Sequence, residues 1–444
     1  MTTVATGRLG RALRHSFHGL PSAYWWLWTS NLINRLGSFV AAFLALYVTT
    51  DLGHSAAFAG FVGALYGLGG TVASVVAGVL TDRVGRRPTI VVSQASTSVA
   101  VVCLALVRDT ATVAVCACLC GFFVNAARPA TQAMMIDIVP QRDRVRAYTL
   151  NYWATNIGLG VSSTAAGAVA RHNYAYLFYA QAAAMVLCTA LVLAKLPESR
   201  PGEGGADGGT EPPQPLPARA ADRSGRAGVS LWTVFADRPF MALAALNLLL
   251  ATIFQLAYVG LPLALQRQGH DSSVYGLVIG LNSLLVVVLQ LPLTRLTGKW
   301  IPGPALVGAS LLAGYGFGLY SVTDSLVPLL LATCVWTLGE IISSPAQVDL
   351  VIRLSPTHGR GRYQGVNNLS FALASLSAPL VSGWTLEHFA PAVLWTVTAA
   401  CGTCVGVGYH LLQRRISGMP AEEARPAPGG ARRGRARWPW RAPR

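Results

Sequence analysis

The chain has 444 residues, of which 53% are hydrophobic and 12% charged, and its mean hydropathy is +0.47. Soluble proteins carry about 25% charged residues, and a soluble core of this size would leave much of its apolar surface in water. The composition therefore excludes an ordinary soluble protein and indicates one whose solvent is lipid. The net charge of +16 would also suit a nucleic-acid binder, so the positions of the charges have to decide.

Apolar runs long enough to cross a bilayer recur along the chain. Roughly 20 helical residues span the hydrocarbon core, and unpaired backbone groups in lipid are costly, so we expect helices. A barrel would instead alternate over segments of about 10 residues. The predicted spans are 23–49, 56–80, 89–107, 111–137, 147–169 and 174–196 in the first half, and 239–266, 274–297, 304–322, 326–351, 363–386 and 391–413 in the second.

The basic residues are unevenly placed between these spans. If both termini are cytoplasmic, Arg108, Arg171 and Arg267 fall in outer loops and Arg35 and Arg128 within helices, while the other Lys and Arg residues lie on the cytoplasmic side. This asymmetry sets the orientation under the positive-inside rule. It explains the net charge without nucleic acid, which we do not expect as a partner.

A polar segment separates the two sets of six spans. Residues from 197 to about 226 are rich in Gly, Pro, Ala and charge, and they cannot bury enough apolar surface to fold. The predicted organisation is a cytoplasmic segment (1–22), a six-helix bundle (23–196), a cytoplasmic linker (197–230), a second six-helix bundle (231–413) and a basic cytoplasmic tail (414–444). The tail either completes the charge bias or contacts anionic lipid headgroups.

The two halves align without gaps at an offset of 216 residues. The identities include residue types that rarely match by chance, among them Asn31/Asn247, Gly60/Gly276, Pro129/Pro345, Asn151/Asn367 and Gly167/Gly383. Parallel repeats of six helices are typical of transporters. The fold class predicted is thus an all-α membrane protein with twelve transmembrane helices in two bundles.

Between the second and third spans the chain reads GVLTDRVGRRP, from Gly78 to Pro88. Gly85 permits an unusual backbone angle, and Pro88 suits the first turn of a helix. Asp82 can be accommodated by Arg83 or by a neighbouring helix N-terminus. A generic basic turn is the simpler interpretation, but the complete spacing favours a specific loop.

In this setting the string resembles the signature loop of the major facilitator superfamily. The resemblance to that family extends over nearly the whole chain. The twelve-helix drug:proton antiporters of the bacterial multidrug-resistance type fit best, and further strings resemble them: Asn34–Gly37, Arg128–Ala130, Asp137–Pro140, Gly339–Glu340, Pro345–Ala346 and Gly361–Gly365. The resemblance implies a secondary transporter, with proton-coupled efflux of amphipathic small molecules by alternating access. The alternative is a uniporter or importer of a metabolite. The resemblance also implies a conformational gate loop that does not touch substrate, formed by Gly78, Asp82, Arg83, Gly85, Arg86 and Arg87.

The fifth span departs from the antiporter pattern G-x-x-x-G-P-x-x-G-G. Here the matching residues are Gly158, Ser162, Ser163, Ala166 and Gly167, so the proline is missing. The small residues still let two helices approach closely. The departure favours the uniporter or importer alternative.

Three charges lie well inside predicted spans, where each costs at least ~2.5 kcal/mol. Glu340 is the candidate for proton coupling or substrate contact, because a buried carboxyl can gain and lose a proton near neutral pH; the alternative is a static ion pair with Arg35 or Arg128. Arg35 is a candidate for the central cavity, with structural pairing as the alternative. For Arg128 the resemblance implies a role in proton relay or in holding an acidic partner, and the alternative is that it braces a kink beside Pro129. Asp137 lies nearer a helix end, where we expect pairing with a loop arginine.

Amides and aromatics within the spans could line a cavity, although aromatics there more often pack or anchor the interface. The candidates are Asn31, Asn34, Asn125, Gln255, Tyr258, Asn282 and Trp336.

Catalytic and nucleotide-binding signatures are missing from the sequence. It contains no H-E-x-x-H, G-x-S-x-G or P-loop string, so we expect neither an enzyme nor an ATP-driven pump, and no cofactor or metal. The expected partners are a small-molecule substrate, protons and the lipid bilayer of the cell membrane, which the chain crosses many times as a monomer.

Overall fold

The computed structural model describes residues 19–198, 231–297, 300–322, 325–356 and 359–418. Most of the predicted linker (197–230), most of the N-terminal segment (1–22) and most of the basic tail (414–444) lie outside the described residues. The described residues are helical and contain no strand.

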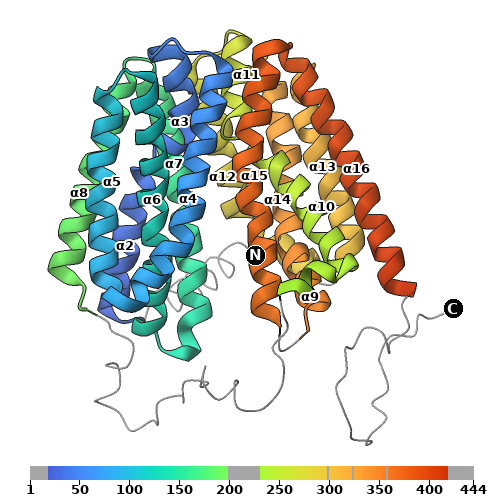
Figure 1. Cartoon of the computed structure of the whole chain (residues 1–444), viewed down its shortest axis with the longest axis horizontal. Helices are drawn as coiled ribbons and strands as arrows, with labels where there is room; N and C mark the ends of the chain where they lie inside the picture. Colours follow the sequence, from blue (N-terminus) through green and yellow to red (C-terminus); the bar gives the residue numbers. More distant parts are fainter. Residues whose placement is uncertain (1–18, 199–230, 298–299, 323–324, 357–358, 419–444) are drawn as a thin grey trace, which may run out of the picture.

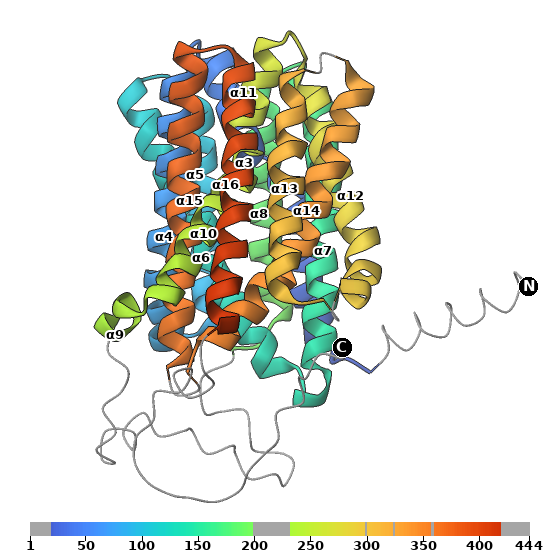
Figure 2. The same ribbon diagram turned by 90° about the vertical axis from the view of Figure 1, so that its right-hand side faces the viewer.

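The described residues of the first half form seven α-helices. They are α2 (Ser22–Leu36), α3 (Val40–Leu46), α4 (Ala56–Val84), α5 (Arg86–Leu106), α6 (Thr110–Ile138), α7 (Arg144–Ala170) and α8 (Tyr174–Lys195). The second half contains α9 (Leu231–Ala236), α10 (Arg238–Gln255), α11 (Gly260–Arg267), α12 (Ser272–Thr297), α13 (Pro302–Gly318), α14 (Leu326–Leu354), α15 (Arg360–His388) and α16 (Pro391–Gly418). Figure 1 shows the two halves side by side, and Figure 2 shows the second half in front of the first, with nearly parallel helices in both views.

Ten stretches in the described part are long and apolar enough to cross a membrane. Two predicted spans, 147–169 and 304–322, are not among the ten. The helix at the second of these, α13, has only 17 residues. The helix at the first, α7, has 27 residues but carries amides at Asn151 and Asn156. Both nevertheless pack within the bundle (Figure 2).

Short polar side chains begin several of the helices. The side chains of Ser55, Asp109, Asn173 and Asp237 accept hydrogen bonds from backbone N–H groups of the first turns of α4, α6, α8 and α10. Such capping satisfies N–H groups that a helix leaves free at its start. These residues therefore fix where the apolar runs begin.

The first span of each half is broken, which the sequence analysis did not predict. After α2, the N–H groups of Phe39 and Val40 both donate to Gln181 Oε1 of α8, at 2.8 and 2.9 Å. After α10, four residues precede α11, whose Pro262 cannot donate to the preceding turn. One break is thus satisfied by a distant amide, and the other is followed by a proline in the first turn of α11.

The halves meet at one end of the bundle. We call the end where α8 stops and α9 starts the linker end (bottom of Figure 1) and the opposite end the far end. Near the far end, a Cβ built on Gly60 would lie 2.8 Å from the Cα of Gly383, and one built on Gly167 would lie 3.1 Å from the Cα of Gly276. The absence of side chains therefore lets α4 approach α15 and α7 approach α12.

Polar contacts add to this boundary at the far end. Arg171 and Asp271 form an ion pair at 3.0 Å, and the Thr49 hydroxyl donates to Gln266 Oε1 at 2.7 Å. Toward the linker end the helices separate. A Cβ built on Gly78 of α4 or Gly365 of α15 would meet no described atom within 4 Å.

Candidate functional site

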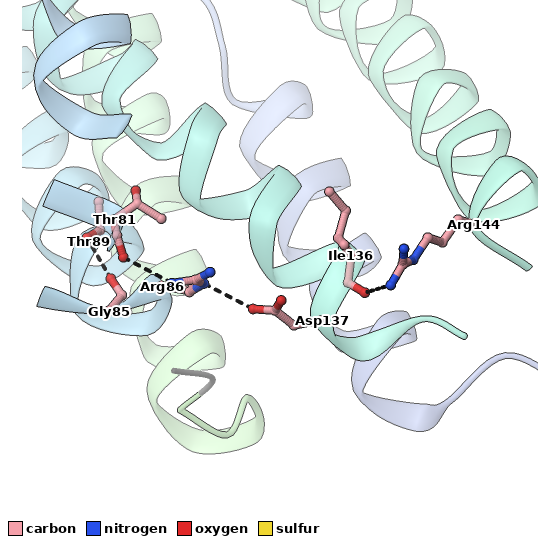
Figure 3. A network of polar contacts seen from close by, with 7 residues as sticks. All are labelled: Thr81, Gly85, Arg86, Thr89, Ile136, Asp137 and Arg144. Carbon is pink, nitrogen blue, oxygen red and sulfur yellow. Dashed lines mark hydrogen bonds and ion pairs between the residues drawn. The ribbon is translucent and has the colours of Figure 1, made fainter. Parts of the chain in front are cut away.

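The GVLTDRVGRRP string forms an almost direct junction between two helices (Figure 3). Helix α4 ends at Val84 and α5 begins at Arg86, so Gly85 alone connects them. Its φ of +113° is a conformation that side chains other than hydrogen disfavour. The Thr89 hydroxyl donates to the Gly85 carbonyl at 2.7 Å and secures the junction.

Arg86 is the centre of this junction. Its side chain is buried, with 8% of the residue exposed. The Nε donates to Asp137 Oδ2 of α6 at 3.0 Å, and Nη1 donates to the Thr81 carbonyl at 3.4 Å (Figure 3). The expected pairing of Asp137 with a loop arginine is confirmed. Because a buried arginine needs a counterion, this pair ties α5 to α6.

The other predicted gate residues are less engaged. Arg87 donates to the Leu193 carbonyl of α8. Asp82 and Arg83 are exposed and form no ion pair within the described part of the chain. Gly78 faces open space. Their role in a gate stays a prediction.

A polar cavity of about 270 Å³ lies within the first half. Four of the predicted residues line it, namely Asn31, Asn34, Arg35 and Arg128. Other lining residues come from α5, α6 and α7, among them Gln94, Gln132, Asn151, Tyr152 and Thr155. The structure thus brings both intramembrane arginines to one cavity.

The amides of this cavity differ in how they are held. Asn31 donates to Asn151 Oδ1 at 2.7 Å, and Asn34 reaches Met185 Sδ at 3.5 Å. The Arg35 Nε is buried and has no hydrogen-bond partner among the described residues. Arg128 is exposed and adjoins Pro129 inside α6. Neither arginine pairs with a carboxylate in the part of the chain that the structure covers.

Glu340 lies on α14 of the second half and is not part of the lining of this cavity. Its Oε2 accepts a hydrogen bond from Asn282 Nδ2 of α12 at 2.9 Å, and the same Nδ2 contacts Thr337 Oγ1 at 3.1 Å. The static ion pair with Arg35 or Arg128 does not form among the described residues. One amide therefore holds a carboxylate that lacks a cationic partner.

The remaining candidates fall into different surroundings. Gln255 and Tyr258 lie at the break between α10 and α11, and Tyr258 is close enough to Glu340, Arg35 and Arg128 to interact electrostatically. Asn125 donates to the Gly121 carbonyl of its own helix. Trp336 is 2% exposed and stacks on Phe317 at 5.0 Å, so it lies in the packed interior of the second half.

Two residues of this region were missed by the sequence analysis. Gln181 is 2% exposed and holds the break after α2, while Gln94 is 5% exposed and lines the cavity. The available signal was a lone amide within an apolar span, since buried polar groups need a reason.

Comparison with known families identifies the class of protein. Residues 27–379 match the model of the Major Facilitator Superfamily. The chain belongs to this superfamily, whose members are transporters, and it is a multi-pass membrane protein.

Similar proteins include transporters with and without an assigned substrate. The chain is 23% identical to the multidrug resistance protein MdtH of Aeromonas hydrophila over 388 residues, covering 85% of this chain and 92% of that protein. It is 22% identical to a Na(+), Li(+), K(+)/H(+) antiporter of Planococcus maritimus, covering 85% and 93%. It is 23% identical to the uncharacterized MFS-type transporter YhjO of Bacillus subtilis, covering 88% and 94%.

Solved structures resemble the fold. A peptide transporter POT in complex with sulfate gives a TM-score of 0.71 at 16% identity, covering 90% of this chain and 96% of that one. The nucleoside transporter NupG gives a TM-score of 0.71 at 12% identity, covering 89% and 100%. At these identities the likeness concerns the fold alone.

Proposed function

We propose that the protein is a secondary transporter that exports amphipathic small molecules in exchange for protons by alternating access. The observation that carries this proposal is the asymmetric boundary between the halves. Gly60 contacts Gly383 near the far end, while Gly78 and Gly365 face open space toward the linker end. Such an arrangement corresponds to one of the two states that a rocking pair of bundles requires.

In this proposal the linker end faces the cytoplasm of a cell membrane. The basic residues of the loops gather at that end, in agreement with the positive-inside rule. Helices α7 and α13 complete a set of twelve crossings, and the structure corresponds to the state open to the cytoplasm. The residues from Gly78 to Arg87 then form a gate loop that stabilises the alternative state.

Glu340 is the proposed proton carrier. Its carboxylate accepts one hydrogen bond from Asn282 and pairs with no cation among the described residues. A carboxyl in such surroundings changes its charge at low cost when water reaches it. Protonation removes the charge and alters the bond to Asn282, which biases one state over the other.

Reconstituted vesicles with an imposed proton gradient test the coupling. A panel of dyes is applied, and we expect gradient-driven uptake into inside-out vesicles by the wild type and loss of that dependence in Glu340→Gln. Asp349→Asn is the matched control, because this carboxylate lies on the same helix but has a 45% exposed side chain that pairs with Arg353. Full proton-driven transport by Glu340→Gln would end the proposed role of Glu340.

The second candidate is a uniporter or importer of a metabolite. The missing proline in α7 favours it. Dissipating the proton gradient separates the two, because transport by a uniporter would not change.

A further inference from the structure

The cavity in the first half carries positive charge without a counterion. Its lining contains Arg35 and Arg128 and no aspartate or glutamate. The two guanidinium groups are close enough to interact electrostatically. Since like charges repel and a charged group within a membrane helix is costly without a counterion, the cavity is incomplete as it stands.

Two buried polar atoms in the same lining also lack partners. Gln94 is 5% exposed, and its Oε1 forms no hydrogen bond with any described residue. The Arg35 Nε is in the same condition. Buried polar groups of native proteins are normally paired, so these atoms point to a ligand that approaches them.

No carboxylate of the described residues forms an ion pair with either arginine. Glu340 lies near enough to interact electrostatically with the lining residue Tyr152, but it belongs to the second half and its Oε2 accepts a hydrogen bond from Asn282. Asp137 lies on α6 but is committed to Arg86 at 3.0 Å. The cavity therefore keeps its positive charge within the described part of the protein.

We propose that this cavity binds the anionic group of an amphipathic substrate, a carboxylate, sulfonate or phosphate, through Arg35 and Arg128. A guanidinium presents parallel N–H donors that match such oxygens. Leu27, Ile90 and Val124 line the same cavity and contact the apolar part of the molecule. The inference rests on the proposed transport function and gives its substrate class as organic anions.

The test uses two xanthene dyes of opposite charge, fluorescein and rhodamine 123, with the full-length protein in nanodiscs. By fluorescence anisotropy we expect fluorescein to bind at least tenfold more tightly than rhodamine 123. Arg35→Gln and Arg128→Gln should each weaken fluorescein at least tenfold, and Arg35→Lys should weaken it less. Arg142→Gln is the control, because that side chain is 87% exposed and lies outside the cavity.

Several outcomes would overturn the inference. They are tighter binding of rhodamine 123, no binding of fluorescein, fluorescein binding that ignores both arginine substitutions, or binding of chloride alone. Size-exclusion profiles identify variants that fail to fold. If Arg35→Gln fails to fold, the affinity of Arg35→Lys for fluorescein tests the role of Arg35.

Transport in proteoliposomes separates this inference from the proposed function. Transport of rhodamine 123 without fluorescein binding would retain the transporter and refute the anion site. Arginine-dependent fluorescein binding without transport of either dye would retain the anion site and refute the proposed transport function.

Discussion

Gly60 of α4 and Gly383 of α15 touch across the boundary between the halves, and their repeat counterparts Gly276 and Gly167 touch in the same way. The offset of 216 residues exchanges the two contacts, since it relates Gly60 to Gly276 and Gly167 to Gly383. A symmetry that the sequence carries as identical residues thus reappears as two equivalent contacts between helices.

A larger side chain at this contact should prevent the halves from meeting. In Gly60→Leu the new Cβ would lie 2.4 Å from the Pro379 carbonyl oxygen, which a helix backbone cannot accommodate. We expect at least a tenfold loss of transport with normal membrane insertion. Gly308→Leu, whose Cβ would meet no described atom within 4 Å, should retain transport. Equal effects of the two substitutions would contradict this prediction.

The hydrogen-bonded pair Asn247–Asn367 should contribute more to stability than the repeat-related pair Asn31–Asn151. Asn247 is fully buried, donates to Asn367 at 2.7 Å and accepts from the Tyr409 hydroxyl at 2.7 Å. Asn247→Ala removes both hydrogen bonds, at a cost of about 1–3 kcal/mol for each buried group left unpaired. Asn31→Ala should cost less, because Asn31 lines a cavity. Thermal unfolding in detergent measures both; a more damaging Asn31→Ala would refute the order.

Arg86 and Asp137 should behave as one unit in a double-mutant cycle. Asp137→Asn leaves the buried Arg86 without its counterion, and Arg86→Gln removes the tie between α5 and α6, so each should lower transport strongly. The double variant removes both charges, so its loss should be smaller than the two single losses combined. Additive effects would mean that the pair does not act as a unit.

The ion pair at the far end should resist mild acid. Hydrogen bonds from Ser273 are the largest cause that lowers the pKa of Asp271, and the positive charge of Arg171 lowers it further. Because the pKa in the folded protein is lowered, the paired carboxylate contributes its full stability at every pH above the ordinary pKa of about 3.9. This contribution is lost only as the pH falls through the lowered pKa of the folded state. After correction for the thiolate fraction at each pH, crosslinking between cysteines placed at Thr49 and Gln266 should therefore be constant from about pH 8 to about pH 5, both above that range.

Asp271→Asn should reduce that crosslinking at every pH in the range. Asp109→Asn is the control, because hydrogen bonds from Thr112 also lower the pKa of Asp109, but this carboxylate caps α6 and does not bridge the halves. If the corrected crosslinking declined between about pH 8 and about pH 5 in the protein that keeps Asp271, another group would hold the boundary.

Local patterns predicted the helices well. The span 174–196 corresponds to α8 (Tyr174–Lys195), and 56–80 is extended in α4 (Ala56–Val84). The break after α2 was not predictable, because it depends on Gln181, which is 142 residues from Phe39 in the sequence. Local apolar periodicity contains no information about such a partner.

The site was predicted in part for a similar reason. The cost of burying charge in lipid selected Arg35, Arg128 and Glu340 as unusual, since each is charged within an apolar span. Which of them share a cavity depends on how helices pack, and the structure places the two arginines, but not Glu340, in the lining of one cavity. Trp336 shows the converse, because an aromatic in a span gives the same signal whether it lines a cavity or packs.

The register of α4 against α15 has a consequence for the opposite state. Gly67 of α4 adjoins Ser375 of α15, so the two helices run past each other in antiparallel register from the Gly60–Gly383 contact onward. Gly78 follows Gly60 by 18 residues, and Gly365 precedes Gly383 by 18. The same two helices thus carry a second pair of glycines, Gly78 and Gly365, which have no close neighbour in this structure. In the proposed alternating-access cycle, these two glycines would form the helix contact when the halves close at the linker end.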